Sequence, residues 1–208
     1  MAGTDSPRAA MIRCAADLIA RHGVAGTSVG DVLAASGAAR GSVYYHFPGG
    51  RAQLMDEAVR HAGEVLGAEL NVARRLPPRR AVAAIAAIWR TRLVASDFAV
   101  GCPIGAGAQA RGSDPDAADA GEEVFLQWGH LLSARLREEG FDDRRADDVA
   151  DTILATIQGA VVLCRARRSP EPLDRVVADL QELLTRTDVG EIEDEELGSG
   201  TAGESRLR

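Results

Sequence analysis

The sequence predicts an all-α protein, and three observations support this fold class. Apolar residues recur at three- and four-residue spacings along almost every segment, as on one face of an amphipathic helix. No segment alternates apolar and polar residues over a strand's length with β-branched enrichment. Serine, aspartate and proline stand where helices would begin, and glycine where they would end. With 208 residues, 46% of them hydrophobic, the chain is long enough to bury a core.

The first fifty residues predict a compact helical head. A helix over 7–22 ends at a glycine. Ser28, with Asp31 three residues later, forms a capping box that opens a second helix. After a Ser-Gly break at 36–37, a short segment over 39–47 follows and is closed by Pro-Gly-Gly. This pattern is a helix, a tight turn and another helix.

Longer helices are expected after the head. One runs from Arg51 to about Ala73 and links the head to the rest of the chain. Further helices are expected from Pro77-Pro78, from Asp114-Pro115, over 144–167 and from Leu173 onward, with 101–112 at best a broken helix. The acidic, Gly/Ser-rich stretch from Asp188 predicts a disordered tail. The chain therefore divides into 1–50, 51–187 and 188–208.

Composition narrows the possible classes of protein. No apolar run of about 18 residues and no signal pattern are present, so neither a membrane span nor secretion is expected, and the cytoplasm is the default location. Cys14, Cys102 and Cys164 are widely separated, which argues against disulfides and a zinc site. No cofactor is expected. Residues 1–60 hold six arginines and five acidic residues (+1), so the net charge of −7 leaves −8 for the remainder. A near-neutral head permits local phosphate binding.

The segment over 39–47 carries the strongest functional signal. Val43 and Phe47 lie four residues apart and are expected to anchor it inward. Its other faces carry hydrogen-bonding and aromatic side chains with almost no negative charge: Arg40, Ser42, Tyr44, Tyr45 and His46. In a helix-turn-helix, the second helix lies in the major groove, where arginine reaches guanine edges and hydroxyls reach phosphates. We therefore expect this segment to bind double-stranded DNA.

Residues 8–55 resemble the DNA-binding domain of the TetR family, through the Thr27-Ser28 opening, Ser36-Gly37, a basic residue and Tyr44-Tyr45-His46-Phe47. The resemblance implies a transcriptional regulator, most simply a repressor, that binds a palindromic operator as a homodimer. It also implies which residues contact DNA. Phosphate contacts are expected from Thr27, Ser28, Tyr45, His46 and Arg51, and groove contacts from Arg40, Gly41, Ser42 and Tyr44. Ala38 and Ala39 replace hydroxyl residues that are frequent in the family, which removes one or two phosphate contacts.

The stretch Phe98–Gly105 resembles one branch of the same family. The resemblance implies a regulatory domain with a cavity for a small-molecule effector, and a dimer interface made by the last two helices. Both of these helices, 144–167 and 173–186, carry apolar residues on more than one face. The candidate ligand-binding residues are the aromatic residues of the middle helices and a nearby thiol: Trp89, Phe98, Cys102, Phe125 and Trp128. Each aromatic residue is equally consistent with plain core packing.

Two other classes of protein remain as alternatives. A thiol-based sensor would use Cys102, and a helical enzyme would use Cys102 or His130. No nucleophile-base spacing, paired carboxylates or phosphate loop supports catalysis. A non-specific DNA-packaging protein would need many cations, which the acidic body disfavours. Glu57 and His61 share a helix face, but no third metal ligand accompanies them.

Overall fold

The computed structural model describes residues 6–71 and 73–185. These residues form α-helices and one 3-10 turn, with no strand among them. The helices are α1 (Pro7–His22), α2 (Val29–Ser36), α3 (Ser42–His46), α4 (Gly50–Leu70), α5 (Pro78–Ala95), α6 (Pro103–Ala108), α7 (Pro115–Glu138), α8 (Asp143–Arg167) and α9 (Glu171–Leu183), with the 3-10 turn η1 at Ala73–Arg75. The all-α prediction is confirmed. The expected tail over 188–208 lies outside the described residues.

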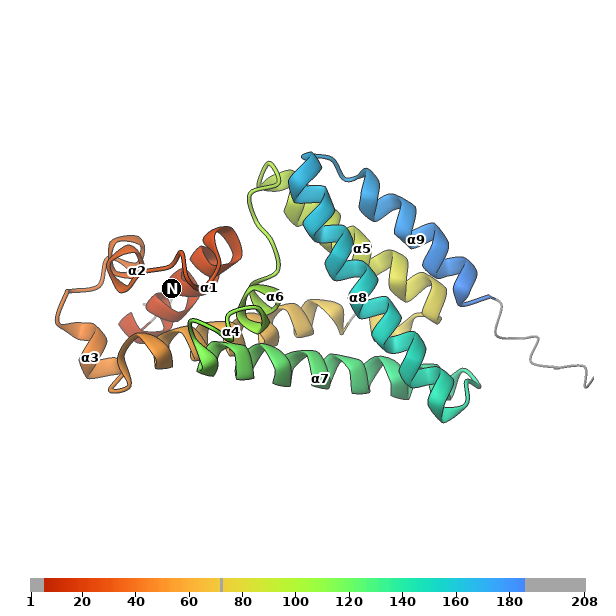
Figure 1. Cartoon of the computed structure of the whole chain (residues 1–208), viewed down its shortest axis with the longest axis horizontal. Helices are drawn as coiled ribbons and strands as arrows, with labels where there is room; N and C mark the ends of the chain where they lie inside the picture. Colours follow the sequence, from red (N-terminus) through yellow and green to blue (C-terminus); the bar gives the residue numbers. More distant parts are fainter. Residues whose placement is uncertain (1–5, 72, 186–208) are drawn as a thin grey trace, which may run out of the picture.

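The head consists of α1, α2 and α3 at one end of an elongated molecule (Figure 1). Ser6 caps α1 by accepting the Ala9 amide at 3.2 Å. The predicted capping box at the start of α2 is confirmed, because Ser28 Oγ accepts the Asp31 amide and the Asp31 carboxylate accepts the Ser28 amide. Gly37 ends α2 at φ +70°, a conformation that glycine adopts without a steric penalty. Local sequence therefore sets the ends of these short helices.

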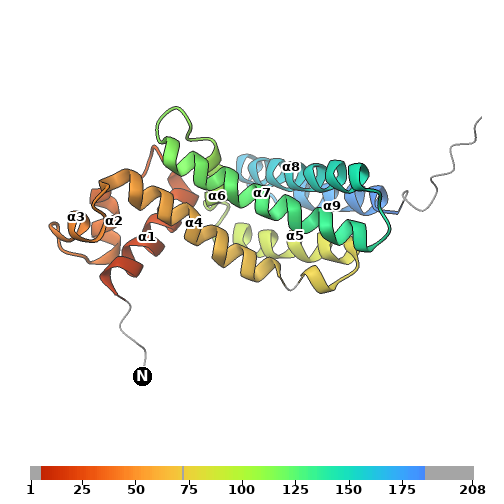
Figure 2. The same ribbon diagram turned by 90° about the horizontal axis from the view of Figure 1, so that it is seen from below.

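Helix α4 belongs to both parts of the molecule (Figures 1 and 2). Its N-terminal half buries Leu54 and Met55 in the core and packs against α1. Its C-terminal half lies beside α7, where a Cβ on Gly63 would come within 2.6 Å of Val124. The glycine is therefore required for the two helices to approach this closely. The expected boundary between residues 50 and 51 falls at the start of this helix.

Helices α5, α7, α8 and α9 form the body, and the short α6 packs against α1, α4 and α7. Helix α8 lies in the middle of this bundle, in contact with α5, α7 and α9. Within the described residues it is the one helix long and apolar enough to meet a membrane-span criterion. Val149, Ile153, Ile157 and Val161 are buried against neighbouring helices, whereas Val162 and Leu163 are exposed, so core packing accounts for only part of its apolar character.

An ion pair joins the head to the body. Asp114 Oδ2 lies 2.7 Å from Arg51 Nη1, and the Asp114 side chain is only 3% exposed. The same carboxylate caps α7, since Oδ1 accepts the Ala117 amide. Arg51 Nη2 also donates to the carbonyl oxygens of Val24 at 2.6 Å and Thr27 at 3.2 Å. One guanidinium thus connects the α1–α2 loop, the first turn of α4 and the first turn of α7.

The expected phosphate contact from Arg51 needs correction. Its guanidinium already donates to two backbone carbonyls and a buried carboxylate, so these donors are not directed toward DNA. The resemblance suggested this contact because the family usually has a lysine at the start of this helix, one spacer residue after Phe-Pro, whereas here Gly49 and Gly50 precede Arg51. Its acidic partner lies 63 residues further along the chain and becomes a neighbour only in the fold.

We predict that Asp114→Ala lowers the free energy of unfolding by about 2 to 4 kcal/mol, because it removes a helix cap and leaves a partly buried guanidinium without its carboxylate. Asp114→Asn keeps a capping oxygen and should lose less. Urea denaturation followed by circular dichroism would measure both. Asp119→Ala, which removes an exposed ion pair with Arg111, is the control and should unfold like the parent protein. Equal urea midpoints for Asp114→Ala and this control would show that the Arg51–Asp114 ion pair does not stabilise the fold.

Candidate DNA-binding surface and ligand cavity

Helix α3 presents its tyrosines to solvent. Val43 and Phe47 are 1% and 0% exposed and fix the helix to the core of the head. Tyr44 and Tyr45 are 75% and 82% exposed. Such exposure of two adjacent aromatic side chains is unusual for a residue type that normally buries its ring. The inward and outward faces predicted for this segment are therefore those of the structure.

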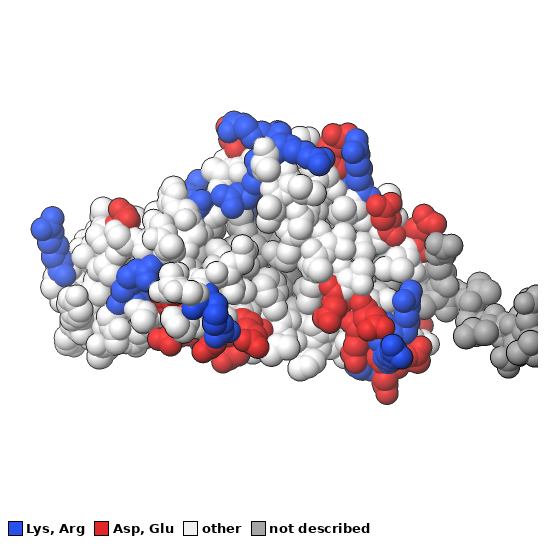
Figure 3. Space-filling model, viewed as in Figure 1, with Lys and Arg blue, Asp and Glu red and all other residues white. Residues whose placement is uncertain are grey.

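The residues around α3 complete this surface. Arg40 and Gly41 are exposed just before the helix, and Ser42 Oγ donates to the Ala39 carbonyl at 2.6 Å. The Tyr45 and His46 rings meet edge to face, with centroids 4.9 Å apart. In Figure 3 the end of the head shows mostly uncharged atoms with isolated basic groups, whereas acidic side chains gather along the lower edge of the molecule. A DNA backbone would thus meet little negative charge at α3.

The N-terminus of α2 offers fewer phosphate ligands than expected. Thr27 is 1% exposed, and its hydroxyl donates to the Gly23 carbonyl at 2.8 Å. The expected contact from the Thr27 hydroxyl is therefore wrong for this structure, because that group closes the α1–α2 loop instead. Ser28 is exposed but hydrogen-bonded to Asp31, and these bonds hold the pKa of the Asp31 carboxyl below its ordinary value. A negative charge consequently remains beside Ser28 at neutral pH.

Another arginine of the head, Arg8, is also paired with a carboxylate. Arg8 Nη2 donates to both carboxylate oxygens of Glu57, at 2.7 and 2.5 Å. Its guanidinium lies 5.2 Å from the centroid of the Phe47 ring, a distance typical of a cation-π contact. These contacts connect α1, the end of α3 and α4. Since Glu57 is engaged here, it does not form a metal pair with His61, and the described residues contain no group of three candidate metal ligands.

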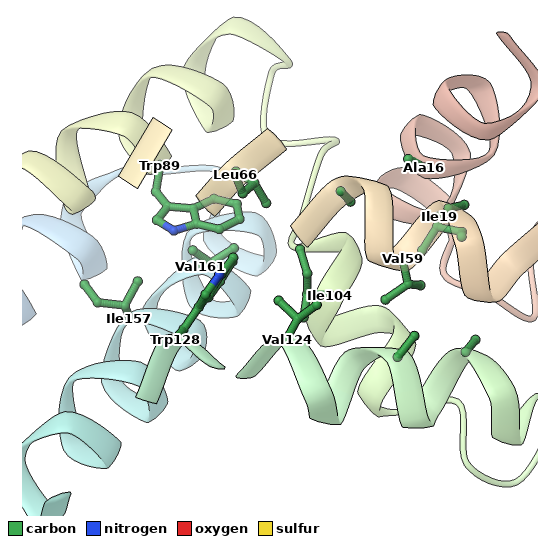
Figure 4. Close-up of a cluster of buried hydrophobic side chains, with 14 of the residues drawn as sticks. Ala16, Ile19, Val59, Leu66, Trp89, Ile104, Val124, Trp128, Ile157 and Val161 are labelled. Atoms are coloured by element: carbon green, nitrogen blue, oxygen red, sulfur yellow. The ribbon is translucent and has the colours of Figure 1, made fainter. Parts of the chain in front are cut away.

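A cavity of about 380 Å³ lies in the body, between α4, α5, α7 and α8. Trp89 of α5 and Trp128 of α7 point into the same region beside Ile157 of α8 (Figure 4). Gly63 and Gly67 contribute backbone to the α4 wall. Most of the lining is apolar. The expected positions of Trp89 and Trp128 in a cavity among the middle helices agree with this geometry.

Polar side chains line part of the same cavity. Arg60 donates to Asp56 at 2.9 Å and also pairs with Glu123, and the hydrogen bond with Glu123 raises the pKa of Arg60. Gln127 and Gln158 add neutral hydrogen-bonding groups. This lining suits a small, mainly apolar molecule that carries a polar group.

The other three candidate ligand residues lie elsewhere. Phe125 contacts the edge of Trp128, with centroids 5.9 Å apart, but lines a more open groove between α7 and α8. Cys102 borders a separate hollow between α1, α6 and α8. Phe98 packs on the hydrophobic core at the end of α5 and is not among the residues that line the cavity. These three side chains therefore do not line the cavity between α4, α5, α7 and α8, because helical spacing predicts burial without identifying which gap a side chain borders.

The environment of Cys102 does not favour a reactive thiol. Its sulfur accepts the Gly105 amide at 3.4 Å and so caps α6. Burial raises the pKa of the Cys102 thiol above its ordinary value. The neutral form therefore dominates at pH 7, whereas a nucleophilic or redox-sensing cysteine needs an appreciable thiolate fraction.

The sequence did not identify several cavity residues. Gly63 and Gly67 lie four residues apart on the inner face of α4, a spacing that can indicate close approach by another group. Ile85, Ile153 and Ile157 have the pattern of ordinary core residues. No local signal distinguishes an isoleucine in a filled core from one beside a cavity.

Comparisons with known proteins agree with this architecture. Residues 12–58 match the family described as "Bacterial regulatory proteins, tetR family", and residues 78–179 match "Transcriptional regulator LmrA/YxaF-like, C-terminal domain". An uncharacterized HTH-type transcriptional regulator of Mycobacterium tuberculosis is 38% identical over 184 residues, which cover 86% of this chain and 94% of the relative. The HTH-type transcriptional regulator LmrA of Bacillus subtilis is 27% identical, with 86% and 97% covered.

The fold is also similar to solved structures. The regulatory protein TetR from Rhodobacter sphaeroides has a TM-score of 0.77 at 19% identity, with 85% of this chain and 97% of that chain covered. A TetR transcriptional regulator from Chloroflexus aurantiacus has a TM-score of 0.73 at 25% identity, with 89% and 98% covered. With a helix-turn-helix at one end and a helical body with a cavity at the other, this chain belongs to the TetR family of bacterial DNA-binding transcriptional regulators.

Proposed function

We propose that this regulator is a cytoplasmic repressor that binds a palindromic operator as a homodimer and is released when a small molecule occupies the cavity. One observation carries the proposal: α4 packs against α1 in the head and lines the cavity in the body. A ligand that displaces this helix would move the recognition helix. The tight contact between Gly63 and Val124 supports such coupling, because closely packed helices move together rather than deform.

On the DNA, Arg40, Gly41, Ser42 and Tyr44 contact base edges in the major groove. Arg40 is exposed, and a guanidinium matches the two acceptors of guanine. Ser28, Tyr45 and His46 contact phosphates on either side of the groove. We omit Thr27 and Arg51 from the proposed contacts, because their hydrogen-bonding groups are used inside the head.

The dimer interface centres on α8. From Thr152 to Ala166, the exposed side of this helix carries no charged residue and includes Thr152, Ala155, Gly159, Val162, Leu163 and Ala166. Val162 and Leu163 are 59% and 43% exposed, which is costly for a surface that stays in water. Helix α9 differs from the sequence-based expectation: its outer side is charged, and its apolar residues pack inward. The apolar surface available to a second copy therefore lies on α8.

The first prediction concerns the recognition helix. Arg40→Ala and Tyr44→Ala should each weaken operator binding by about 1 to 3 kcal/mol, because each removes a base contact while Val43 and Phe47 still anchor α3. Mobility-shift titration against an operator selected from random duplex DNA would measure the effect. Arg144→Ala, which removes the same charge from a distant exposed site on α8, is the matched control. Wild-type operator affinity in both head variants would show that α3 does not contact the bases of the operator.

The second prediction concerns dimerisation. Gly159→Arg should yield folded monomers that bind the operator poorly, since a Cβ at residue 159 meets no atom within 4 Å in the protomer but would face the partner. Analytical ultracentrifugation measures the assembly state. Ala134→Arg, at an exposed alanine of α7, should remain dimeric. A dimeric Gly159→Arg protein would place the interface elsewhere.

The third prediction concerns the effector. Trp89 and Trp128 are the only tryptophans, and both line the cavity, so a bound ligand should change tryptophan emission. Compounds screened by this signal should bind more weakly once the protein is saturated with operator. By thermodynamic linkage, each compound should weaken operator binding by the same factor. Identical titrations with and without operator would show that the cavity does not control DNA binding.

A further inference from the structure

The last turn of α1 receives hydrogen bonds from two distant parts of the body. The Gly101 amide donates to the Ala20 carbonyl at 2.7 Å. Arg165 Nη2, at the end of α8, donates to the Arg21 carbonyl at 3.2 Å and to the Ala99 carbonyl at 3.1 Å. The final carbonyls of a helix lack partners within their own helix, and a cation near them is electrostatically favourable. The body therefore caps α1 of the head.

We propose that Arg165 and Gly101 form an interdomain clamp that sets the orientation of the head, with Arg165 as the positioning residue. This inference rests on the proposed function, in which two recognition helices of a dimer must match the spacing of successive major grooves. The clamp holds the C-terminus of α1, whereas α3 lies at the far end of the head from the body (Figure 1). A small rotation of the head about the clamp would therefore displace α3 the most.

The close approach of Arg165 depends on the glycine. A Cβ at residue 101 would lie 2.6 Å from Arg165 Nη1 and 3.2 Å from its Cζ. Gly101 has no positive φ, so its backbone conformation does not require glycine. The missing side chain instead leaves room for the Arg165 guanidinium. A side chain at residue 101 would therefore force the Arg165 guanidinium to shift from the position in which it donates to the α1 carbonyl. Gly101 and Arg165 are thus sterically matched.

Residues in an unfavourable backbone conformation flank the clamp. Asp97 and Phe98, just before it, are consecutive non-glycine residues at φ +51° and +61°. Arg168, three residues after Arg165, is at φ +51° and pairs with Asp97 at 2.5 Å. Arg165 Nε is buried and has no hydrogen-bond partner among the described residues. Such costs persist only where the surrounding structure enforces them, and they cluster at functional sites and switch regions.

Both attachments of the clamp originate in walls of the ligand cavity. Helix α8 contributes Ile157 and Gln158 to the cavity about two turns before Arg165. Helix α5 contributes Trp89 and leads directly into the segment that ends at Gly101. A ligand that shifts either helix would move the atoms that cap α1. This route is separate from α4 and from Arg51, which donates to the Val24 and Thr27 carbonyls of the α1–α2 loop.

The experiment compares Arg165→Gln and Gly101→Ala with Arg167→Gln, which makes the same charge change at an exposed site of α8. Operators selected by the full-length wild-type protein would be shortened or lengthened by one base pair between half-sites. Each added pair rotates one half-site by about 35°. We expect the operator affinity of wild type and Arg167→Gln to fall at least about tenfold when the spacing is changed. The affinity of both clamp variants should fall less than about threefold, because a head without the clamp can follow the rotation of its half-site.

A second readout needs no DNA. Hydrogen exchange at the Gly101 amide should accelerate at least about tenfold in Arg165→Gln, while amides of α4 keep their wild-type protection. Unchanged exchange, or wild-type spacing preference in both clamp variants, would overturn the proposal. Weaker binding to all operators with the spacing preference retained would also overturn it. If the wild-type protein selects no palindrome, the proposed operator mode fails, and the exchange measurement still decides whether the clamp exists.

Discussion

The arrangement of the two domains depends on a buried carboxylate, that of Asp114. A carboxylate that is almost fully removed from water must be paired and hydrogen-bonded, or it becomes strongly destabilising. Here Arg51 and the first turn of α7 satisfy it, and the remaining donors of Arg51 satisfy carbonyls of the α1–α2 loop. Three segments that are far apart in sequence are thereby held in one geometry. This connection fixes the α1–α2 loop relative to the start of α4 and α7, and the contacts of Arg165 and Gly101 with the end of α1 are separate from it.

Helix α8 shows how one segment can serve several surfaces. One side supplies Ile153 and Ile157 to the core and the cavity. The opposite side is uncharged and exposed around Gly159, where a second copy would pack. Its last turns carry Arg165 to the end of α1. In the proposed function, the ligand, the partner subunit and the DNA-binding head would therefore all contact this one helix.

The charge distribution favours sequence-dependent recognition over general attraction to DNA. Residues 61–187 hold 16 arginines and 19 acidic residues, so the body carries no excess of cations. Arg8, Arg51 and Arg60, in or next to the head, are each paired with a carboxylate. Sequence-independent affinity grows with the number of phosphates that free cations neutralise. Binding by α3 must then rely more on Arg40 and on the aromatic and hydroxyl groups of Tyr44 and Tyr45. Such a surface is suited to discriminating among sites rather than coating DNA.

The sequence by itself determined the helical fold, the capping box at Ser28 and Asp31, and the exposed face of α3, because these features depend on interactions within a few residues along the chain. It also indicated that Trp89 and Trp128 would face inward. Only the tertiary structure decided which gap each buried side chain borders, and so separated these tryptophans from Phe98, Cys102 and Phe125. It likewise assigned Arg51 and Thr27 to the interior of the head. Spacing along a helix fixes the direction of a side chain but not its partner. Asp114 lies 63 residues from Arg51 in the sequence, and Arg21 lies 144 residues from Arg165. Only tertiary packing brings such groups together.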